Sequence, residues 1–268
     1  MRETKRRLPG LMACAALALL AAGPAGAAGS QTAEAFPLEL DHVLIWVAKG
    51  APEAKALEDA GLQKLGKSSR HAGQGTASTA FLFENAYLEL IWIEDRQEAS
   101  KNGARSGIDM VVRADWKRTG ASPFGVGLHR ASGATAPLPF PAMDYHAEWM
   151  GPDASIQFAR TVADRGTPMY FVVPESMAIP VGPSLEKLLQ EDPEYAKLLK
   201  HRLGLKRITG VKIVTTGKGP SSTGATLTRG GVARIEAGKS PLMEVTFDEG
   251  AQNKTLDLRN HLPLVLKY

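Results

Sequence analysis

Cysteine is nearly absent from this chain of 268 residues, and the single Cys14 lies in an N-terminal segment with the pattern of a secretion signal. The remainder therefore has no disulfide, no thiolate nucleophile and no cysteine metal site. It also lacks a surplus of charge. Residues 1–28 hold four of the 32 basic and one of the 28 acidic residues, which leaves 28 basic residues against 27 acidic ones. Neither this balance nor any arginine-rich, aromatic-interleaved stretch indicates a nucleic-acid partner.

Familiar catalytic and nucleotide-binding motifs are missing as well. G-x-S-x-G, H-E-x-x-H, the Walker A loop and G-x-G-x-x-G do not occur. Glycines near Gly73 and Gly230 lack the strand-to-helix context that a phosphate loop requires, and we expect Ser221, Ser222 and Thr223 to form a flexible loop. These absences remove the common hydrolase, zinc-protease and nucleotide-binding classes.

The N-terminal segment 1–28 has the organisation of a secretory signal. Basic residues precede the apolar run from Leu11 to Ala22, and small residues at 25–27 offer a cleavage site. The run is short and rich in alanine, whereas a membrane span needs about 20 apolar residues. We therefore expect an exported protein, periplasmic or secreted, with no membrane span after cleavage. Lipid attachment at Cys14 is the alternative.

The rest of the chain is long enough for a full hydrophobic core, with 44% hydrophobic residues over the whole sequence. Short strand patterns follow one another with few helices between them, which predicts an α+β fold. We expect a linker at 29–37, a domain at 38–175 and an additional C-terminal α+β module at 176–268 packed on it. The order of strands and a covering helix in the second half resembles a weak internal repeat of the first.

A hairpin with a polar mouth is the most informative stretch. Polar residues and glycines over 70–76 precede a strand at 78–83 and a second strand at 87–93. Alternation places Glu89 on a face with apolar neighbours, and the opposite face is apolar too. Since a buried carboxylate needs a partner, Glu89 marks a site. The rim residues His71, Gln74 and Thr76 are candidate substrate contacts, or simply a glycine-bearing loop that starts a strand.

The first strand, residues 38–47 (LELDHVLIWV), contains a histidine within a buried pattern. Strict alternation puts Leu40, His42, Leu44 and Trp46 on one face and Asp41 on the other. A helix is expected at 52–60, where Pro52 begins it and Gly61 ends it. Trp46 is a candidate wall for an apolar ligand.

The remaining elements follow from local patterns. We expect surface helices within 96–120, a loop at 132–141 and helices within 184–204, with His201 and His261 in exposed segments. Further strands are predicted at 124–130, 144–150, 155–160, 168–173, 210–215, 232–236, 243–247 and 262–266.

The combination of LDHVLIWV, RHAGQGT and NAYLELIWIED resembles the glyoxalase-like group of the vicinal oxygen chelate superfamily. The resemblance extends over residues 38–95 and more weakly to FGVGLHR and PMYFVV. It implies paired β-α-β-β-β modules whose curled mixed sheets enclose a cleft, often with a divalent metal such as Mn, Fe, Ni or Zn. His42 matches the metal-binding histidine of the first strand, and Glu89 matches the hairpin carboxylate.

The second half of such a metal cage is missing from this sequence. The matching positions fall near Val126 and Val173, which are apolar. A third metal ligand must come from elsewhere, and the nearest donors are His129 and, in MDYHAEW, His146 or Glu148. His129 falls three residues beyond the matching position and on the other face of the strand, so His146, or alternatively His71, must complete the site.

Two functions remain open on these residues. The first is a metal-dependent lyase, isomerase or dioxygenase that acts on a small oxygenated organic molecule, with the metal as Lewis acid and Glu89 as ligand or catalytic base. The second is a metal-free protein that binds or sequesters such a molecule, with His42 and Glu89 as hydrogen-bonding anchors. A scaffold for protein contacts, or a homodimer, stays a further alternative.

Overall fold

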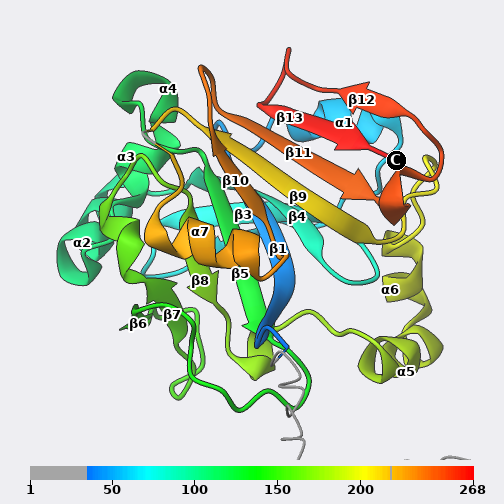
Figure 1. Cartoon of the computed structure of the whole chain (residues 1–268), viewed down its shortest axis with the longest axis horizontal. Helices are drawn as coiled ribbons and strands as arrows, with labels where there is room; N and C mark the ends of the chain where they lie inside the picture. Colours follow the sequence, from blue (N-terminus) through cyan, green and yellow to red (C-terminus); the bar gives the residue numbers. More distant parts are fainter. Residues whose placement is uncertain (1–34, 218) are drawn as a thin grey trace, which may run out of the picture. The chain divides into compact units, whose positions relative to one another are not determined.

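The computed structural model describes residues 35–217 and 219–268, and Phe36–Tyr268 form one compact unit. The expected signal segment 1–28, and the expected linker up to residue 34, lie outside the described residues. In the described part, strands gather into two mixed sheets, and helices cover them (Figure 1). The α+β prediction is confirmed.

Sheet A contains eight of the described strands in the order β2-β3-β4-β1-β5-β8-β7-β6. Its strands are β1 (Leu38–Trp46), β2 (Ser69–His71), β3 (Thr76–Leu82), β4 (Tyr87–Ile93), β5 (Phe124–Arg130), β6 (Ala142–Tyr145), β7 (Ile156–Ala159) and β8 (Met169–Val172). Sheet B contains five in the order β10-β9-β11-β13-β12. These are β9 (Ile208–Thr215), β10 (Arg234–Ala237), β11 (Leu242–Phe247), β12 (Thr255–Asp257) and β13 (Leu264–Lys267).

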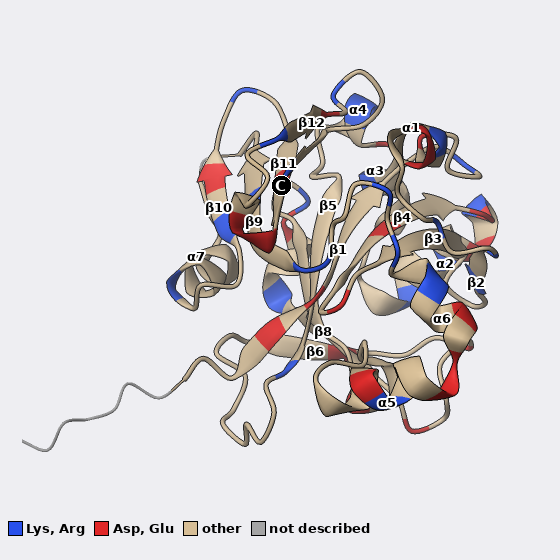
Figure 2. Cartoon of the chain, turned by 90° about the vertical axis from the view of Figure 1, so that its right-hand side faces the viewer, with Lys and Arg blue, Asp and Glu red and all other residues tan. Residues whose placement is uncertain are grey.

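Helices occupy the connections. They are α1 (Ala54–Ala60), α2 (Arg96–Ser106), α3 (Met110–Ala114), α4 (Trp116–Thr119), α5 (Pro183–Glu191), α6 (Pro193–Leu198) and α7 (Ser222–Arg229), with 3-10 turns η1 (Arg160–Ala163), η2 (Glu175–Met177) and η3 (Asp248–Gly250). Positive and negative side chains are interspersed over α1, α5 and α6 (Figure 2), in keeping with the near balance of charge. None of the helices in the described residues has the length and apolar character to cross a membrane.

Sheet A is built from two modules of the same design. In the first, β4 pairs in parallel with β1, and β3 and β2 follow as antiparallel neighbours; in the second, β8 pairs in parallel with β5, and β7 and β6 follow in the same way. The antiparallel pair β1–β5 joins them. The paired modules expected from the sequence are thus present, although the second has a loop rich in Pro, Ala and Gly where the first has α1.

The internal repeat expected in the second half is wrong. The repeat lies within sheet A, because sheet B has a different connectivity: β9 pairs directly with β10 in parallel through α7, whereas β1 and β2 are not neighbours. The first strand of the β6–β7 pair is also shorter than predicted and ends at Tyr145. The boundary predicted at 175/176 stays a prediction.

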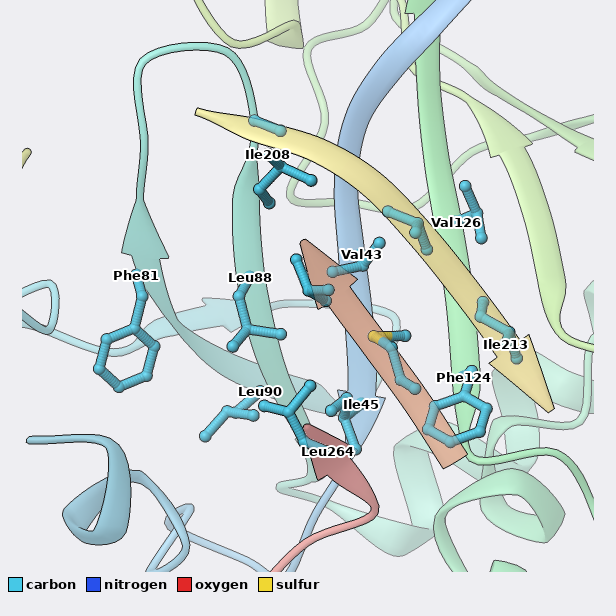
Figure 3. Close-up of a cluster of buried hydrophobic side chains, with 14 of the residues drawn as sticks. Val43, Ile45, Phe81, Leu88, Leu90, Phe124, Val126, Ile208, Ile213 and Leu264 are labelled. Atoms are coloured by element: carbon cyan, nitrogen blue, oxygen red, sulfur yellow. The ribbon is translucent and has the colours of Figure 1, made fainter. Parts of the chain in front are cut away.

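The main core lies between the two sheets. Figure 3 draws Val43, Leu88 and Val126 of sheet A together with Ile213 and Leu264 of sheet B in one cluster of side chains. All five are fully buried. Burial of one such aliphatic side chain contributes about 1.5 to 3 kcal/mol. Since this core takes one face of sheet A, the other face is left to line a cavity, with a second apolar cluster around it.

Candidate functional site

A cavity of about 520 Å³ lies on the face of sheet A that is turned away from sheet B. Both modules and the connection after β8 contribute to its wall, which is mostly apolar. Apart from the indoles of Trp46 and Trp149, its polar or titratable side chains come from the first module and are His42, Ser69, Arg70, His71, Gln74, Ser78, Thr79, Tyr87 and Glu89. The volume falls within the range of pockets for small organic ligands.

A bulge in β1 positions His42. The pairing of β1 with β5 runs from Leu40↔Leu128 directly to His42↔Gly127, so Asp41 is an extra residue in the strand. Leu40 packs against the main core, and the cavity face begins at His42. The predicted placement of Leu40 on the face of His42 is therefore wrong, because the bulge interrupts the alternation.

The His42 ring has a fixed orientation. It stacks on Tyr87 with ring centroids 4.3 Å apart and lies 5.2 Å from Phe171. Behind it, Gly127 leaves the space that the ring fills, since a Cβ built at residue 127 would lie 2.3 Å from Cε1 of His42. Burial, and next the charge of Glu89, raises the pKa of Tyr87 well above its ordinary value, so this phenol stays neutral.

Asp41 is a fully buried carboxylate whose contacts suit the ionised form. Its Oδ1 lies 2.6 Å from Nδ1 of His42, and its Oδ2 accepts the backbone N–H of Ile179 at 2.9 Å. Burial alone would raise the pKa of Asp41, but His129, His42 and the Ile179 amide together hold it well below its usual range. An ionised Asp41 only accepts, so Nδ1 of His42 carries a proton and Nε2 is left for the cavity.

Glu89 stands beside that nitrogen. Its Oε2 lies 3.8 Å from Nε2 of His42, and its side chain is 11% exposed. Leu44 pairs with Glu89 across the parallel β1–β4 ladder, which places both on the cavity face. Asp41, His42 and Glu89 therefore form a row of carboxylate, imidazole and carboxylate whose last two members face the cavity.

His129 extends this row away from the cavity. Its Nδ1 lies 3.4 Å from Oδ2 of Asp41, and its Nε2 lies 3.4 Å from Oε2 of Glu39. Burial lowers the pKa of His129, but Asp41 and Glu39 outweigh it and raise the pKa above its ordinary value. A positive His129 helps to keep the buried Asp41 ionised.

The rim residues form one hydrogen-bonded network. Nδ1 of His71 lies 2.9 Å from Oγ1 of Thr76, and this oxygen accepts from Nε2 of Gln74 at 2.8 Å. The Tyr145 hydroxyl and the Trp149 indole N–H both donate to Oε1 of Gln74, at 3.0 and 3.2 Å. His71 also packs on the Trp149 ring, and burial lowers the pKa of His71. Burial likewise raises the pKa of Tyr145 to about 12.

Comparison with known proteins identifies the family. The family model described as a glyoxalase-like domain matches residues 40–229. The chain belongs to this family. No curated protein matches it significantly. Among solved structures, it resembles a hypothetical protein from Staphylococcus aureus with 13% sequence identity and a TM-score of 0.49, over 86% of this chain and 98% of that one.

The glyoxalase-like domain brings together most of the residues predicted for the site. His42, Trp46, His71, Gln74 and Glu89 all line the cavity. Thr76 lies behind the rim, where it holds His71 and Gln74. His146 is exposed and is not among the cavity-lining residues; its Nδ1 lies 3.0 Å from the Ala154 carbonyl.

Several residues of this glyoxalase-like site were missed from the sequence. Asp41 was assigned to the wrong face, Tyr87 had no role, and His129 was considered only as a third metal donor. Val126, expected to be the counterpart of His42, belongs to the main core; the residue across from His42 is Gly127. A glycine within a strand pattern signals a close approach by another group, and Gly127 carried that signal.

The donor set fits half of a metal centre. Over the residues that the structure describes, no group of three or more histidine, cysteine or acidic side chains could hold a metal ion. His42 and Glu89 are two donors, and Asp41 supports His42 as a carboxylate supports a metal-binding histidine. The neighbouring positions of the second module are Gly127 and Phe171, which have no donor atoms. The described side chains around His42 and Glu89 therefore do not complete a metal centre by themselves.

Proposed function

We propose that the protein binds a small oxygenated organic molecule in the cavity and that His42, with Glu89 beside it, exchanges a proton with this molecule. One observation carries the proposal: Asp41 fixes the proton on Nδ1 of His42, so Nε2 faces the cavity next to the Glu89 carboxylate. An imidazole oriented by a buried carboxylate is an arrangement suited to general acid–base catalysis. Membership of the glyoxalase-like family supports a small-molecule role.

The chemistry of this pair is the transfer of one proton. With His42 neutral, its Nε2 accepts a proton from a ligand hydroxyl or from an acidic C–H group, and Asp41 stabilises the imidazolium that forms. Glu89 then faces the positive ring and holds the charge in place. The apolar remainder of the wall lowers the local dielectric and strengthens both interactions.

A ligand screen tests the proposal. Thermal unfolding is measured with a set of small ketones, phenols and hydroxy ketones, with and without EDTA. Binding at 100 times Kd stabilises a folded protein by about 2.7 kcal/mol. We expect stabilisation that survives EDTA in the natural chain and is lost in His42→Asn and Glu89→Gln.

The matched control is Glu84→Gln, the same substitution in the turn of the same hairpin and outside the cavity wall. It is expected to bind as the natural chain does. If no compound in the set stabilises the protein, or if every stabilising compound does so equally in His42→Asn, the proposal is wrong.

Catalysis and simple binding differ in one observable. Incubation of each bound compound with the protein, followed by mass spectrometry and NMR of the small molecule, shows a new product for an enzyme and unchanged compound for a binding protein. The His42→Asn variant separates turnover in the cavity from a contaminant. A divalent metal requirement would appear as turnover that EDTA abolishes and one metal restores.

Export is a further part of the proposal. The basic segment, apolar run and small residues within 1–28 support cleavage and passage across a membrane. N-terminal sequencing of the protein from fractionated cells that express the full chain tests this. An intact N-terminus in the cytoplasmic fraction would contradict it.

A further inference from the structure

The direction of hydrogen bonding at the cavity rim is fixed by an indole. The Trp149 Nε1–H can only donate, and it donates to one side-chain atom of Gln74 at 3.2 Å. That atom must therefore be the amide oxygen Oε1, which also accepts from the Tyr145 hydroxyl at 3.0 Å. The amide nitrogen of Gln74 consequently faces Thr76.

The same order continues to His71. Nε2 of Gln74 donates to the Thr76 hydroxyl oxygen at 2.8 Å, and the other contact of that oxygen, among the described residues, is Nδ1 of His71 at 2.9 Å. Between these two neighbours, only Nδ1 can accept the single hydroxyl hydrogen. A neutral His71 therefore carries its proton on Nε2, and so does a protonated one. The ring nitrogen left for a ligand is a donor.

The opposite end of the cavity has the reverse polarity. Nδ1 of His42 donates to Asp41, so Nε2 of a neutral His42 accepts. As a carboxylate, Glu89 beside it offers acceptor sites only. A ligand must bring a hydroxyl or another donor to this end.

The two ends are well separated. His71 pairs with Thr76, and Thr76 pairs with Ile93, so these side chains share a face with Glu89, four residues before Ile93 on β4. At about 3.3 Å per residue, the backbone positions are roughly 13 Å apart along the strand. Besides burial, the charges of Glu89 and His42 affect the pKa of His71, so the side chains approach one another more closely than the backbone positions do. An elongated ligand shorter than this backbone spacing can therefore contact both ends. Between them, Ile91 and its β1 neighbour Trp46 offer an apolar wall, and Ser78 of β3 adds one hydroxyl.

The charges of the wall disfavour an anion. Arg70 is the one arginine or lysine that lines the cavity in the described chain, and its guanidinium pairs with Glu98 at 2.7 Å. Glu89 is the one acidic side chain in the wall. A carboxylate or phosphate would face Glu89 without a free cation to balance it.

We infer that the cavity selects an uncharged, elongated molecule with a hydroxyl at one end for His42 and Glu89 and a carbonyl or other acceptor at the far end for His71. This inference rests on the proposed binding function and specifies its ligand class. His71 is the residue that determines specificity at the acceptor end. Gln74 is a positioning residue, since it acts through Thr76.

A proton-order experiment tests the role of Gln74. In Gln74→Glu, one carboxylate oxygen still accepts from Tyr145 and Trp149. The other oxygen replaces the amide N–H and accepts the hydroxyl hydrogen of Thr76. The Thr76 oxygen must then accept a hydrogen bond from Nδ1 of His71. Nitrogen NMR of histidine-labelled full chain is expected to show the neutral ring protonated on Nε2 in the natural protein and on Nδ1 in the variant. Gln97→Glu on the exposed side of α2 is the control and should leave the ring unchanged. An unchanged tautomer in Gln74→Glu would overturn the assignment.

A matched set of probes tests the ligand class. 4-Hydroxyacetophenone carries a hydroxyl and a carbonyl at opposite ends of a ring, 4-methoxyacetophenone lacks the donor, 4-ethylphenol lacks the acceptor, and 4-hydroxybenzoate is anionic. A buried group left without its partner costs about tenfold or more in affinity. We expect calorimetry to show the tightest binding for 4-hydroxyacetophenone, and equal binding of its methyl ether or tighter binding of the benzoate would overturn the class.

The two proposals fail in different ways. If none of the four probes binds although other compounds in the broad screen do, the ligand class is wrong and the binding function stands. If no compound of any class binds, the binding function and the ligand class that rests on it both fall. The His71 proton order, measured without ligand, is then still decided by the Gln74→Glu comparison.

Discussion

At the scale of single residues, the site depends on two neighbours in sequence that share one hydrogen bond. Asp41 and His42 would point to opposite faces of a regular strand, but the bulge at Asp41 brings its carboxylate to the edge of the His42 ring. A buried carboxylate then holds the imidazole without occupying space in the cavity. The cavity keeps room for a ligand next to Nε2.

Gly127 is the residue that makes this ring position feasible. In Gly127→Ala, the new Cβ would meet the His42 ring at 2.3 to 2.7 Å, so the ring must move and its bond to Asp41 must lengthen. Overpacking of this kind costs about 1 to 3 kcal/mol. We expect denaturant unfolding to show that loss, together with weaker binding of any ligand found in the screen.

The control for this substitution is Gly66→Ala, where a Cβ has nothing within 4 Å. It is expected to leave both stability and ligand binding close to those of the natural chain. Equal effects of the two substitutions would contradict the role of Gly127.

The raised pKa of His129 is expected to make the free energy of unfolding depend on pH. Its folded pKa is raised by Asp41 and Glu39, so it stabilises the folded protein below the unfolded value of about 6.5, and this contribution is lost as the pH rises through the folded pKa. The loss is at most about 1.4 kcal/mol per pH unit for one proton. Above pH of about 6.5, we expect the unfolding free energy of the natural chain to fall more steeply than that of His129→Asn. Parallel profiles would refute this.

The sequence predicted the position of Glu89 correctly, but it misplaced the residues around His42 on the first strand and its neighbour. Glu89 followed from the regular alternation of β4, which the structure preserves. Asp41 and Val126 were misplaced because one extra residue in β1 changes the face of a side chain without any change in hydrophobic pattern. Only contacts between distant strands decide where such a bulge lies.

At the scale of elements, α7 is the clearest addition to what the sequence indicated. Residues 221–223 were expected to form a flexible loop, but Ser221 caps α7, and its side chain accepts the Gly224 N–H at 3.2 Å. This short helix contains one glycine, Gly224, and three threonines, and these residues have weak helix propensity. Packing of Leu227 into the main core supplies what propensity does not.

The cap predicts a measurable effect on this helix. Ser221→Ala removes the capping oxygen and is expected to lower the unfolding free energy by about 1 kcal/mol, the typical value for a lost N-cap. The adjacent and exposed Ser222 makes no cap contact, so Ser222→Ala is the matched control with little effect. Urea unfolding of both variants measures the difference, and a larger loss in Ser222→Ala would show that the cap is not the cause.

Other elements show where local patterns suffice. The hairpin β3–β4 and the stop of α1 at Gly61 (φ 108°) match the prediction closely, because turn chemistry and alternation are local signals. His201 was expected to be exposed, but it is buried, with Nδ1 accepting the Gln63 N–H and Nε2 bonded to the Leu82 carbonyl. The basic residues around His201 predicted exposure, but the end of β3 packs against this histidine, and local sequence does not show such a contact.

At the scale of the whole folded unit, the core between the sheets should make residues 36–268 unfold together. All four tryptophans of the chain lie between residues 46 and 149, which is outside sheet B. Met243→Ala in β11 opens a space in the main core, where Met243 is fully buried, and should cost about 2 to 5 kcal/mol.

Tryptophan fluorescence and far-UV circular dichroism are expected to report the same lowered midpoint for Met243→Ala. The comparison is informative because the substitution is in sheet B and the fluorescent probes are not. A fluorescence transition that keeps its midpoint while circular dichroism shows an earlier one would mean that the C-terminal segment 176–268 unfolds as a separate domain.

The bond from the Ile179 amide to Asp41 gives this protein a built-in reporter. That amide belongs to the connection after β8, yet it exchanges with solvent only when its bond to Asp41 opens. Any ligand that draws charge toward His42 changes how firmly Asp41 holds the amide. The exchange rate of the Ile179 amide hydrogen is therefore expected to change when a ligand binds in the cavity, even before a substrate is known. The peptide that contains Ile179 includes none of the residues that bind the polar ends of the ligand.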